Sequence, residues 1–222
     1  MDYSTKPTCL EKIANLTRLN SRFHKYQEDK INQDNSIFIS PVQATLIHQG
    51  KINKDSTIIS KFNKQINLHE TLGKKANLFS NGFYMTFYLS PKDKHYWRIP
   101  YNSKPISTKI NNGKSKIPII TGLEKFFPKI DFFEKSIKNN ATIGTIFQTK
   151  NFPYAMIAVG SLNVNSIHTI KQDYFKKGDV GGYFNLGSSI LLCFPKNLEL
   201  TSLIKTKTKV NIGDKILKIK VS

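Results

Sequence analysis

Apolar residues along this chain gather into short segments that are separated by polar stretches containing Gly, Asn, Pro and Lys. From residue 37 onward these segments are rich in β-branched and aromatic side chains, which is typical of strands. The predicted strands are IFISP (37–41), ATLIHQGKI (44–52), STIISKF (56–62), FYMTFYL (83–89), ATIGTIFQT (141–149), YAMIAVGSLNV (154–164), SILLCF (189–194) and KILKIKV (215–221). The pattern predicts a mainly β domain of the α+β class.

The first 36 residues follow a different pattern. Apolar residues recur at helical spacing after Pro7, with basic residues between them, so we predict a short amphipathic helix that ends near Tyr26. A polar connector, residues 27–36, follows it. The helix either packs on the core or lies with its basic face on a membrane surface. The predicted organisation is therefore a helix and connector over 1–36 and one domain over 37–222.

Two later regions are harder to interpret. Residues 104–137 show little periodicity, because Gly113, Pro118 and Pro128 interrupt them. The C-terminal segment TKVNIGDKILKIKV is interpreted as a β-hairpin that turns at Gly213 and Asp214, with its lysines on the solvent-facing side.

Composition fits one globular domain, with 39% hydrophobic and 11% aromatic residues among 222. No apolar run approaches the roughly 18 to 20 residues that a membrane-spanning helix needs. The N-terminus lacks the layout of a secretory signal, so we expect a location in the cytosol or on the cytosolic face of a membrane. Cys9 and Cys193 are too few for a disulfide scaffold or a zinc site. Of the histidines, His24, His48, His69 and His168 lack ligand spacing, and no metal site is expected.

The formal charge of +19 suggests an anionic partner. Only Arg18, Arg22 and Arg98 are arginines, whereas bidentate recognition of phosphate or guanine favours arginine over lysine. Nucleic-acid binding is therefore not expected. Attraction to anionic lipid headgroups requires no such geometry, so an anionic membrane surface is the expected partner.

Three segments carry motifs in a fixed order. They are SPVQATLIHQGKI (40–52), NGFYMTFYLSPKDKHYWRIPYN (81–102) and KKGDVGGYFNLGSSILLCF (176–194). Together they resemble the pyruvoyl-dependent phosphatidylserine decarboxylases: the SPADG segment, the YLSPxDYHxxHxP segment and the KGxxxGxF-x-LGS processing region. The matching positions are Ser40, Pro41, Gly50, Lys51, Ile52, Asn81, Gly82, Tyr88, Leu89, Ser90, Pro91, Asp93, His95, Pro100, Lys177, Gly178, Gly182, Phe184, Leu186, Gly187 and Ser188.

This resemblance implies a chain that cuts itself between Gly187 and Ser188. The products would be a β chain ending at residue 187 and an α chain, 188–222, whose first residue is a pyruvoyl group made from Ser188. The pyruvoyl group would serve as the electron sink when phosphatidylserine loses CO₂ to give phosphatidylethanolamine. His95 matches the histidine that protonates the product carbon, and Tyr96 and Trp97 beside it either line a pocket or pack in the core.

Two positions depart from the family pattern at the residues that would activate a serine nucleophile. The family activates its serine with an Asp-His pair, but Gln43 stands at the aspartate position and Arg98 at the histidine position. Neither side chain accepts a proton under ordinary conditions. Val180 also replaces an acidic residue that is frequent in the family.

These departures leave two main interpretations and a variant of the first. One is a peripheral membrane decarboxylase that processes itself with His95 or another base. The other is a non-processing pseudoenzyme that keeps the fold and a lipid-binding or membrane-binding role. A third, a pyruvoyl enzyme for another amine-bearing substrate such as an amino acid, shares the difficulty of the first. The sequence leaves open whether the chain forms a homodimer.

Overall fold

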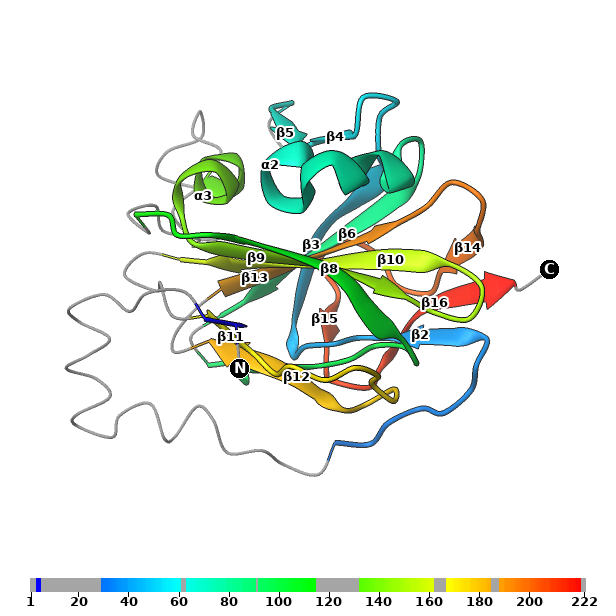
Figure 1. Cartoon of the computed structure of the whole chain (residues 1–222). Helices are drawn as coiled ribbons and strands as arrows, with labels where there is room; N and C mark the ends of the chain where they lie inside the picture. Colours follow the sequence, from blue (N-terminus) through cyan, green and yellow to red (C-terminus); the bar gives the residue numbers. More distant parts are fainter. Residues whose placement is uncertain are drawn as a thin grey trace, which may run out of the picture.

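A computed structural model of the chain describes residues 3–4, 29–60, 63–90, 92–114, 132–161, 167–184 and 188–220. Its centre is a seven-stranded antiparallel sheet (Figure 1). In spatial order the strands are β15 (Lys209–Val210), β3 (Ala44–Lys51), β6 (Phe83–Leu89), β13 (Ser188–Phe194), β10 (Pro153–Gly160), β9 (Thr142–Gln148) and β8 (Lys104–Asn111). The mainly β prediction is confirmed.

Strand β13 lies in the middle of this sheet, hydrogen-bonded to β6 on one side and β10 on the other. All seven of its residues are buried. Buried side chains on both faces explain why the sequence of this strand is a continuous apolar run rather than an alternating one. The predicted strand at 189–194 is confirmed.

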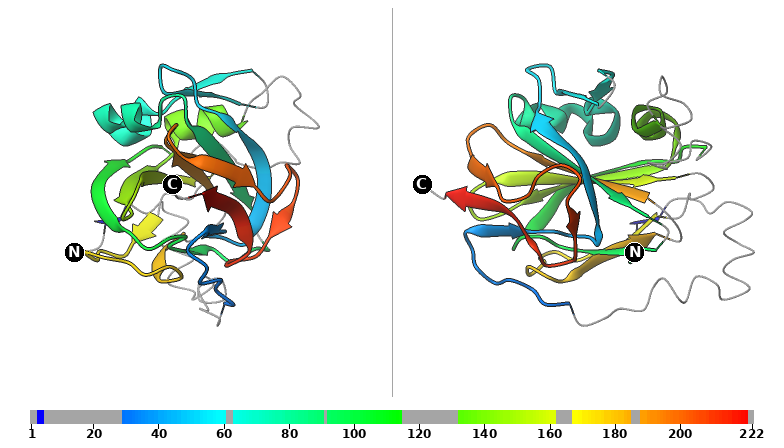
Figure 2. Two further views of the ribbon diagram at one scale, coloured as in Figure 1. Left: turned by 90° about the vertical axis from the view of Figure 1, so that its right-hand side faces the viewer. Right: turned by 180° about the vertical axis from the view of Figure 1, so that it is seen from behind.

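Smaller sheets complete the β structure. A four-stranded sheet joins β1 (Tyr3–Ser4), β11 (Ile167–Thr169), β12 (Val180–Phe184) and β7 (Tyr96–Arg98). A three-stranded sheet joins β14 (Glu199–Ser202), β16 (Lys215–Lys220) and β2 (Ile37–Ile39), and a pair joins β4 (Thr57–Ile59) with β5 (Gln65–Asn67). Figure 2 shows β2 and β16 together on the side of the central sheet where β12 lies.

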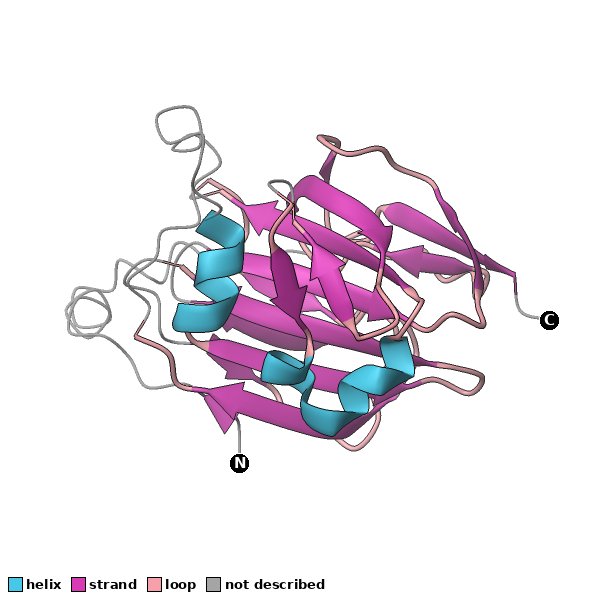
Figure 3. Ribbon diagram, turned by 90° about the horizontal axis from the view of Figure 1, so that it is seen from above, coloured by secondary structure: helices cyan, strands magenta, loops and turns pink. Residues whose placement is uncertain are grey.

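The central sheet separates two hydrophobic cores. One face carries Ile190, Leu192 and Phe194 of β13 and packs against residues of β2, β7, β12 and β16. The other face carries Leu191 and Cys193 and is covered by β4, β5, α2 (His69–Leu72), η2 (Gly73–Phe79) and α3 (Phe132–Asn139). Figure 3 shows the helices lying across this second face. Successive β13 side chains thus enter different cores, as the pleat of a strand requires.

At two places the hydrophobic pattern of the sequence did not predict the structure. The poorly patterned region from residue 104 contains β8, an edge strand whose residues are only partly buried. The predicted C-terminal hairpin is wrong, because β15 pairs with β3 while β16 pairs with β2 and β14. The turn between them docks on Ser40, whose N–H and C=O bond the backbone of Asp214 and Gly213. Turn residues identify a reversal but not the partner of each strand. Lys215, Lys218 and Lys220 of β16 are exposed, as predicted.

The N-terminal prediction is described only at its ends. Tyr3–Ser4 pairs with β11 as strand β1. The predicted helix from Pro7 to Tyr26 lies outside the described residues. Residues 29–36 run over the surface of the domain, with the Ile31 side chain near Gly178 and the Lys30 carbonyl near Gly213.

Candidate functional site

Ser188 is the first residue of β13, with Leu89 of β6 and Gly160 of β10 as its cross-strand partners. It is fully buried, and its Oγ has no hydrogen-bond partner among the described residues. By strand alternation its side chain lies on the face of Ile190, whereas that of Ser189 lies on the opposite face. Gly187, the predicted cleavage position, lies outside the described residues, so the bond between the two is not described.

The end of β10 is fixed beside Ser188 by hydrogen bonds to the end of α3. The Nδ2 of Asn140 donates to the carbonyl of Gly160 (2.9 Å), and the N–H of Gly160 donates to the carbonyl of Ala141 (2.9 Å). Asn140 and Gly160 are both buried, so these hydrogen bonds satisfy polar groups that water does not reach. The end of β10 next to Ser188 is therefore held both by the hydrogen bonds of the sheet and by these contacts with residues 140 and 141.

The loop after β6 brings His95 to the same region. Asp93 orders this loop, because its Oδ2 accepts the N–H and the Oγ–H of Ser90, both at 2.8 Å. Its Oδ1 forms an ion pair with Lys209 at 3.0 Å. His95 is fully buried, and its carbonyl accepts the N–H of Phe184, four residues before Ser188 (2.7 Å). One loop thus joins Leu89, the neighbour of Ser188, to His95.

Strand β7 presents its residues to two faces. Trp97 enters the core beside Phe184, with ring centroids 4.8 Å apart, and lines a cavity of about 320 Å³ together with Ile99, Gly181 and Met156. Tyr96 is also buried, but its hydroxyl donates to Oδ2 of Asp29 at 2.8 Å. Of the two residues proposed for a pocket, Trp97 lines a cavity and Tyr96 belongs to a polar cluster.

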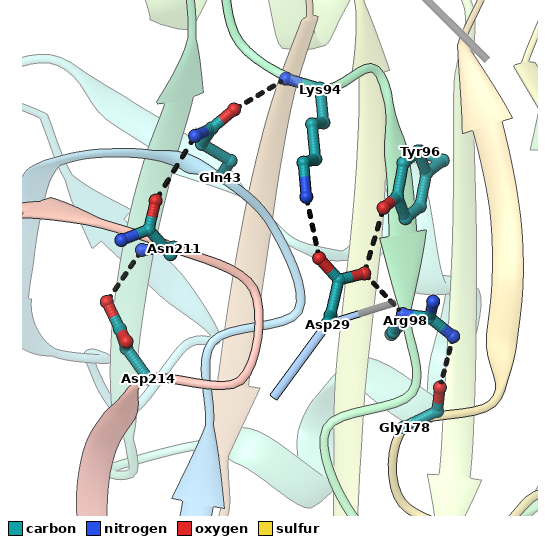
Figure 4. A network of polar contacts seen from close by, with 8 residues as sticks. All are labelled: Asp29, Gln43, Lys94, Tyr96, Arg98, Gly178, Asn211 and Asp214. Atoms are coloured by element: carbon teal, nitrogen blue, oxygen red, sulfur yellow. Dashed lines mark hydrogen bonds and ion pairs between the residues drawn. The ribbon is translucent and has the colours of Figure 1, made fainter. Parts of the chain in front are cut away.

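Gln43 occupies the position of the family aspartate, and both ends of its amide are engaged (Figure 4). Its Oε1 accepts the main-chain N–H of Lys94 (3.0 Å), and its Nε2 donates to Oδ1 of Asn211 (3.1 Å). The N–H of Asn211 in turn donates to Oδ2 of Asp214 (2.7 Å). The Gln43 amide therefore links the loop between β6 and β7 to the turn between β15 and β16.

Arg98, at the family's histidine position, is bound to Asp29 through its Nε (2.7 Å) and to the carbonyl of Gly178 through an Nη (2.8 Å). Lys94 bonds the other Asp29 oxygen at 2.7 Å. Tyr96 and Arg98 are two residues apart in β7, so the strand places them on one face. Lys94 lies two residues before the strand, and all three side chains meet the same carboxylate (Figure 4).

The pKa values in this cluster follow from its contacts. Burial alone would raise the pKa of Asp29, but the hydrogen bonds from Lys94, Arg98 and Tyr96 outweigh burial and lower it. Burial opposes the charge of Lys94, and the Asp29 carboxylate reverses that effect and raises the pKa of the amine. Asp29 is therefore a carboxylate at neutral pH.

Sequence reasoning missed Asp29. The residue lies in a polar stretch among acidic, basic and amide residues, where nothing in the local pattern marks one acid as buried. The one available signal was the run of donors at 94, 96 and 98, which required an acceptor.

The KG pair of the processing region anchors the segment that carries Asp29. The Nζ of Lys177 is buried and donates to the carbonyls of Asp34 (2.6 Å) and Ile37 (2.8 Å). Burial lowers the pKa of this amine to about 8, and the Asp34 carboxylate opposes the shift only partly. Gly178 adopts φ +94° and supplies the carbonyl that Arg98 bonds.

A second cavity lies on the far face of the central sheet. Its volume is about 470 Å³, and Ile47, Ile58, Tyr88 and Phe133 are among its lining residues. Because β6 and β13 separate it from Ser188, it is not part of the same site. The described ranges hold no group of three or more His, Cys, Asp or Glu side chains suited to a metal ion. Within those ranges, every helix is too short or too polar to span a bilayer.

Comparison with known proteins identifies the family. The sequence model of the phosphatidylserine decarboxylase family matches residues 16–218. A phosphatidylserine decarboxylase proenzyme of Halalkalibacterium halodurans is 30% identical over 182 residues, which cover 80% of this chain and 67% of that protein. Proenzymes of the same name from Bacillus cereus and Bacillus anthracis are 28% identical over 216 residues, or 93% of this chain and 78% of each relative. The chain belongs to the phosphatidylserine decarboxylase family.

Proposed function

We propose that this protein is a phosphatidylserine decarboxylase that cuts itself between Gly187 and Ser188 and forms phosphatidylethanolamine and CO₂ from phosphatidylserine. The observation that carries the proposal is the position of Ser188 at the start of the central strand. Its buried Oγ has no hydrogen-bond partner among the described residues. A buried hydroxyl that lacks a hydrogen bond costs free energy, and a role in chemistry would account for a serine at this position. The relatives are named as proenzymes, which agrees with such a role.

The residues present fit a pyruvoyl group at position 188. In the proposed cut, Oγ attacks the Gly187 carbonyl and the peptide bond gives way to an ester. Elimination leaves the Gly187 carboxylate and an unsaturated residue 188, and water then replaces its nitrogen, which leaves as ammonia. When present, the pyruvoyl group supplies an electron sink for loss of CO₂. His95, which is buried on the loop that starts next to Ser188, would deliver a proton to the product carbon.

The environment of Gln43 and Arg98 favours a second candidate, a family member that does not cut itself. Gln43 has no basic site and Arg98 stays protonated, so neither can take the proton from Ser188. The side chains of both are engaged elsewhere, with Asn211 and Asp29 respectively. Such a protein would keep the fold and a lipid-binding role without making pyruvoyl.

For both candidates we propose a peripheral location on the cytosolic face of a membrane. The chain carries 34 Lys and Arg against 15 Asp and Glu, and this excess favours an anionic lipid surface. The phospholipid would then reach the protein from the bilayer to which it is bound.

Intact mass spectrometry of the purified protein tests the proposal. We expect two chains, residues 1–187 and 188–222, the second with a blocked N-terminus, and we expect one full-length chain from the Ser188→Ala control. A chain that stays full-length after prolonged incubation would contradict self-cleavage. In that case the double variant Gln43→Asp with Arg98→His separates the two explanations. Cleavage of the variant would show that only the activating pair is missing, and an intact variant would favour the non-processing candidate.

A further inference from the structure

Trp97, the single tryptophan of the chain, lines the cavity of about 320 Å³ beside β7. The residue is 1% exposed, and its indole N–H has no hydrogen-bond partner among the described residues. Gly181 of β12 lies beside this N–H and also lines the cavity, and a Cβ added to it would be 2.6 Å from Nε1. Because Gly181 has no side chain, the donor stays uncovered. A buried N–H without an acceptor costs free energy, so a ligand that supplies an acceptor would be favoured here.

Apolar side chains form the floor of this cavity. They belong to β9 and β10 of the central sheet: Ile143, Phe147, Met156 and Ala158. Two polar lining residues, Thr108 and Thr145, bond each other through their hydroxyl groups at 3.3 Å. The volume is at the lower end of the range of about 300–1,000 Å³ for small-molecule sites, which combine apolar walls with a few placed polar groups. The cavity therefore suits a small, mostly apolar ligand.

The rim of the cavity favours a ligand without net charge. Lys171 and Asp173 are the charged residues among its described lining residues, and both are exposed. Their charges are opposite, so the rim offers little net attraction to an anion or to a cation. The ligand that fits is neutral, with an apolar body and one hydrogen-bond acceptor for Trp97.

The exposed wall of the cavity, residues 170–173, is held at its two ends. The N–H of Ile170 donates to the carbonyl of Gly181 (3.0 Å). Phe175 and Ser103 exchange two main-chain hydrogen bonds, of 2.8 and 3.0 Å. Between these anchors, the main chain of residues 171–174 makes no hydrogen bond to another element of the described structure. This wall can move aside without breaking main-chain hydrogen bonds of its own, which gives a ligand a route of entry.

We propose that this cavity binds a small neutral molecule with an aliphatic body and a carbonyl group, a medium-chain ketone or ester, whose oxygen accepts the indole N–H of Trp97. Neither Ser188 nor His95 is among the lining residues that the structure describes. The inference goes beyond the decarboxylase proposal, because binding here requires neither the cut nor a pyruvoyl group.

The fluorescence of Trp97 tests binding directly, because the chain has no other tryptophan. Titration of the full chain with 2-heptanone should change this fluorescence in a saturable way. Ala158→Leu fills the cavity and should abolish the saturable change. Ile47→Phe is the matched control, since it fills the cavity on the far face of the central sheet, and it should bind like the unchanged protein. If Ala158→Leu lowers the thermal midpoint too far, Ser107→Leu on the edge strand β8 narrows the same cavity.

The hydrogen bond from Trp97 can be tested by changing one atom. Benzothienylalanine in place of tryptophan has sulfur where the indole has N–H, and it alters residue 97 alone. By calorimetry, 2-heptanone should bind this protein about threefold to tenfold more weakly, the net effect of one hydrogen bond. The alkene 2-methyl-1-heptene, which has CH₂ in place of the carbonyl oxygen, should bind both proteins equally. An equal change for the ketone and the alkene would overturn the assigned hydrogen bond.

Three further outcomes would overturn the proposal. A fluorescence change that stays linear in 2-heptanone concentration would leave water as the occupant of the cavity. Saturable binding that survives both Ala158→Leu and Ser107→Leu would place the ketone elsewhere. Equal affinity for heptanoate, an anion of similar size, would contradict a neutral ligand.

Two sources of the carbonyl group are distinguished with dihexanoylphosphatidylcholine below its micelle concentration. Competition with 2-heptanone assigns an acyl ester of a phospholipid, and absence of competition assigns a free carbonyl compound. The Ser188→Ala protein should bind 2-heptanone as tightly as the unchanged protein does. Failure of the decarboxylase proposal would therefore leave this result unaffected.

Discussion

Gly182 shows how single residues of the processing region are selected by packing rather than by chemistry. A Cβ at this position would collide with the indole ring of Trp97 and with the carbonyl oxygen of His168. Trp97 is fully buried and packs against Phe184, so its ring cannot move aside without disrupting the core. The glycine of the motif is therefore required by a close approach between β12 and β7.

Substituting this glycine should destabilise the fold. We expect Gly182→Ala to lower the free energy of unfolding by about 1–3 kcal/mol, the usual cost of overpacking a core. Gly50→Ala is the control, because a Cβ on this β3 residue would meet Tyr84 at an ordinary contact distance of 3.4 Å. Urea unfolding of the two variants measures the difference. Similar stability for both would mean that Trp97 yields to the added methyl group.

At the scale of elements, the contact between the 29–37 segment and the turn before β12 depends on a buried lysine. Lys177 donates to two main-chain carbonyls of the segment, and its Nζ lies 5.1 Å from the centre of the Tyr101 ring. Both of these acceptors are neutral carbonyls, so burial dominates and the pKa of the amine falls to about 8. The lysine of the motif is thus explained by its position under the segment that brings Asp29 to β7.

The pKa of Lys177 makes stability depend on pH in a defined window. Below about pH 8 the amine is protonated in both the folded and the unfolded chain, so it adds no pH dependence. Between about pH 8 and the ordinary value of 10.5 only the unfolded chain keeps the proton, and the free energy of unfolding should rise with pH. Urea unfolding at pH 7 and 9.5 should show that the unchanged protein gains stability relative to Lys177→Met. A difference that stays constant or shrinks would contradict the lowered pKa.

At the scale of the whole molecule, the strands of residues 188–220 pair with strands from the preceding part of the chain. β13 lies between β6 and β10, β15 pairs with β3, and β16 pairs with β2. The C-terminal piece therefore contributes strands to two sheets and apolar side chains to both cores. Cutting the chain before residue 188 would break one covalent bond and leave these contacts in place.

A cut protein should consequently remain a single particle. After cleavage, we expect the 1–187 and 188–222 chains to elute together in size-exclusion chromatography and to separate only in denaturant. The uncut Ser188→Ala protein provides the reference elution volume. Loss of the small chain on the native column would contradict the central placement of β13.

Much of the fold could be predicted because its central strands are continuous apolar runs that can be recognised in the sequence. The apolar runs at 83–89, 154–160 and 189–194 became β6, β10 and β13, since strands buried on both faces must be apolar throughout. The edge strand β8 gave no such signal, because half-exposed positions tolerate polar residues. The C-terminal turn was recognised, but the partners of its two strands were not, since those depend on contacts with Ser40 far away in the chain.

By itself, the sequence determined the family, the mainly β class, and the residues around which the function is proposed: Ser188, His95, Gln43 and Arg98. Motif order and residue type suffice for these, because they depend on the identity of side chains and their spacing. Only the tertiary structure decided that Gln43 links Lys94 to Asn211 and that Arg98 is bound to Asp29. These contacts join residues more than fifty positions apart, and a charge or amide finds such a partner through the pairing of strands and the path of the chain across them. The sequence reveals that the activating pair is missing, and the fold reveals the contacts its replacements make.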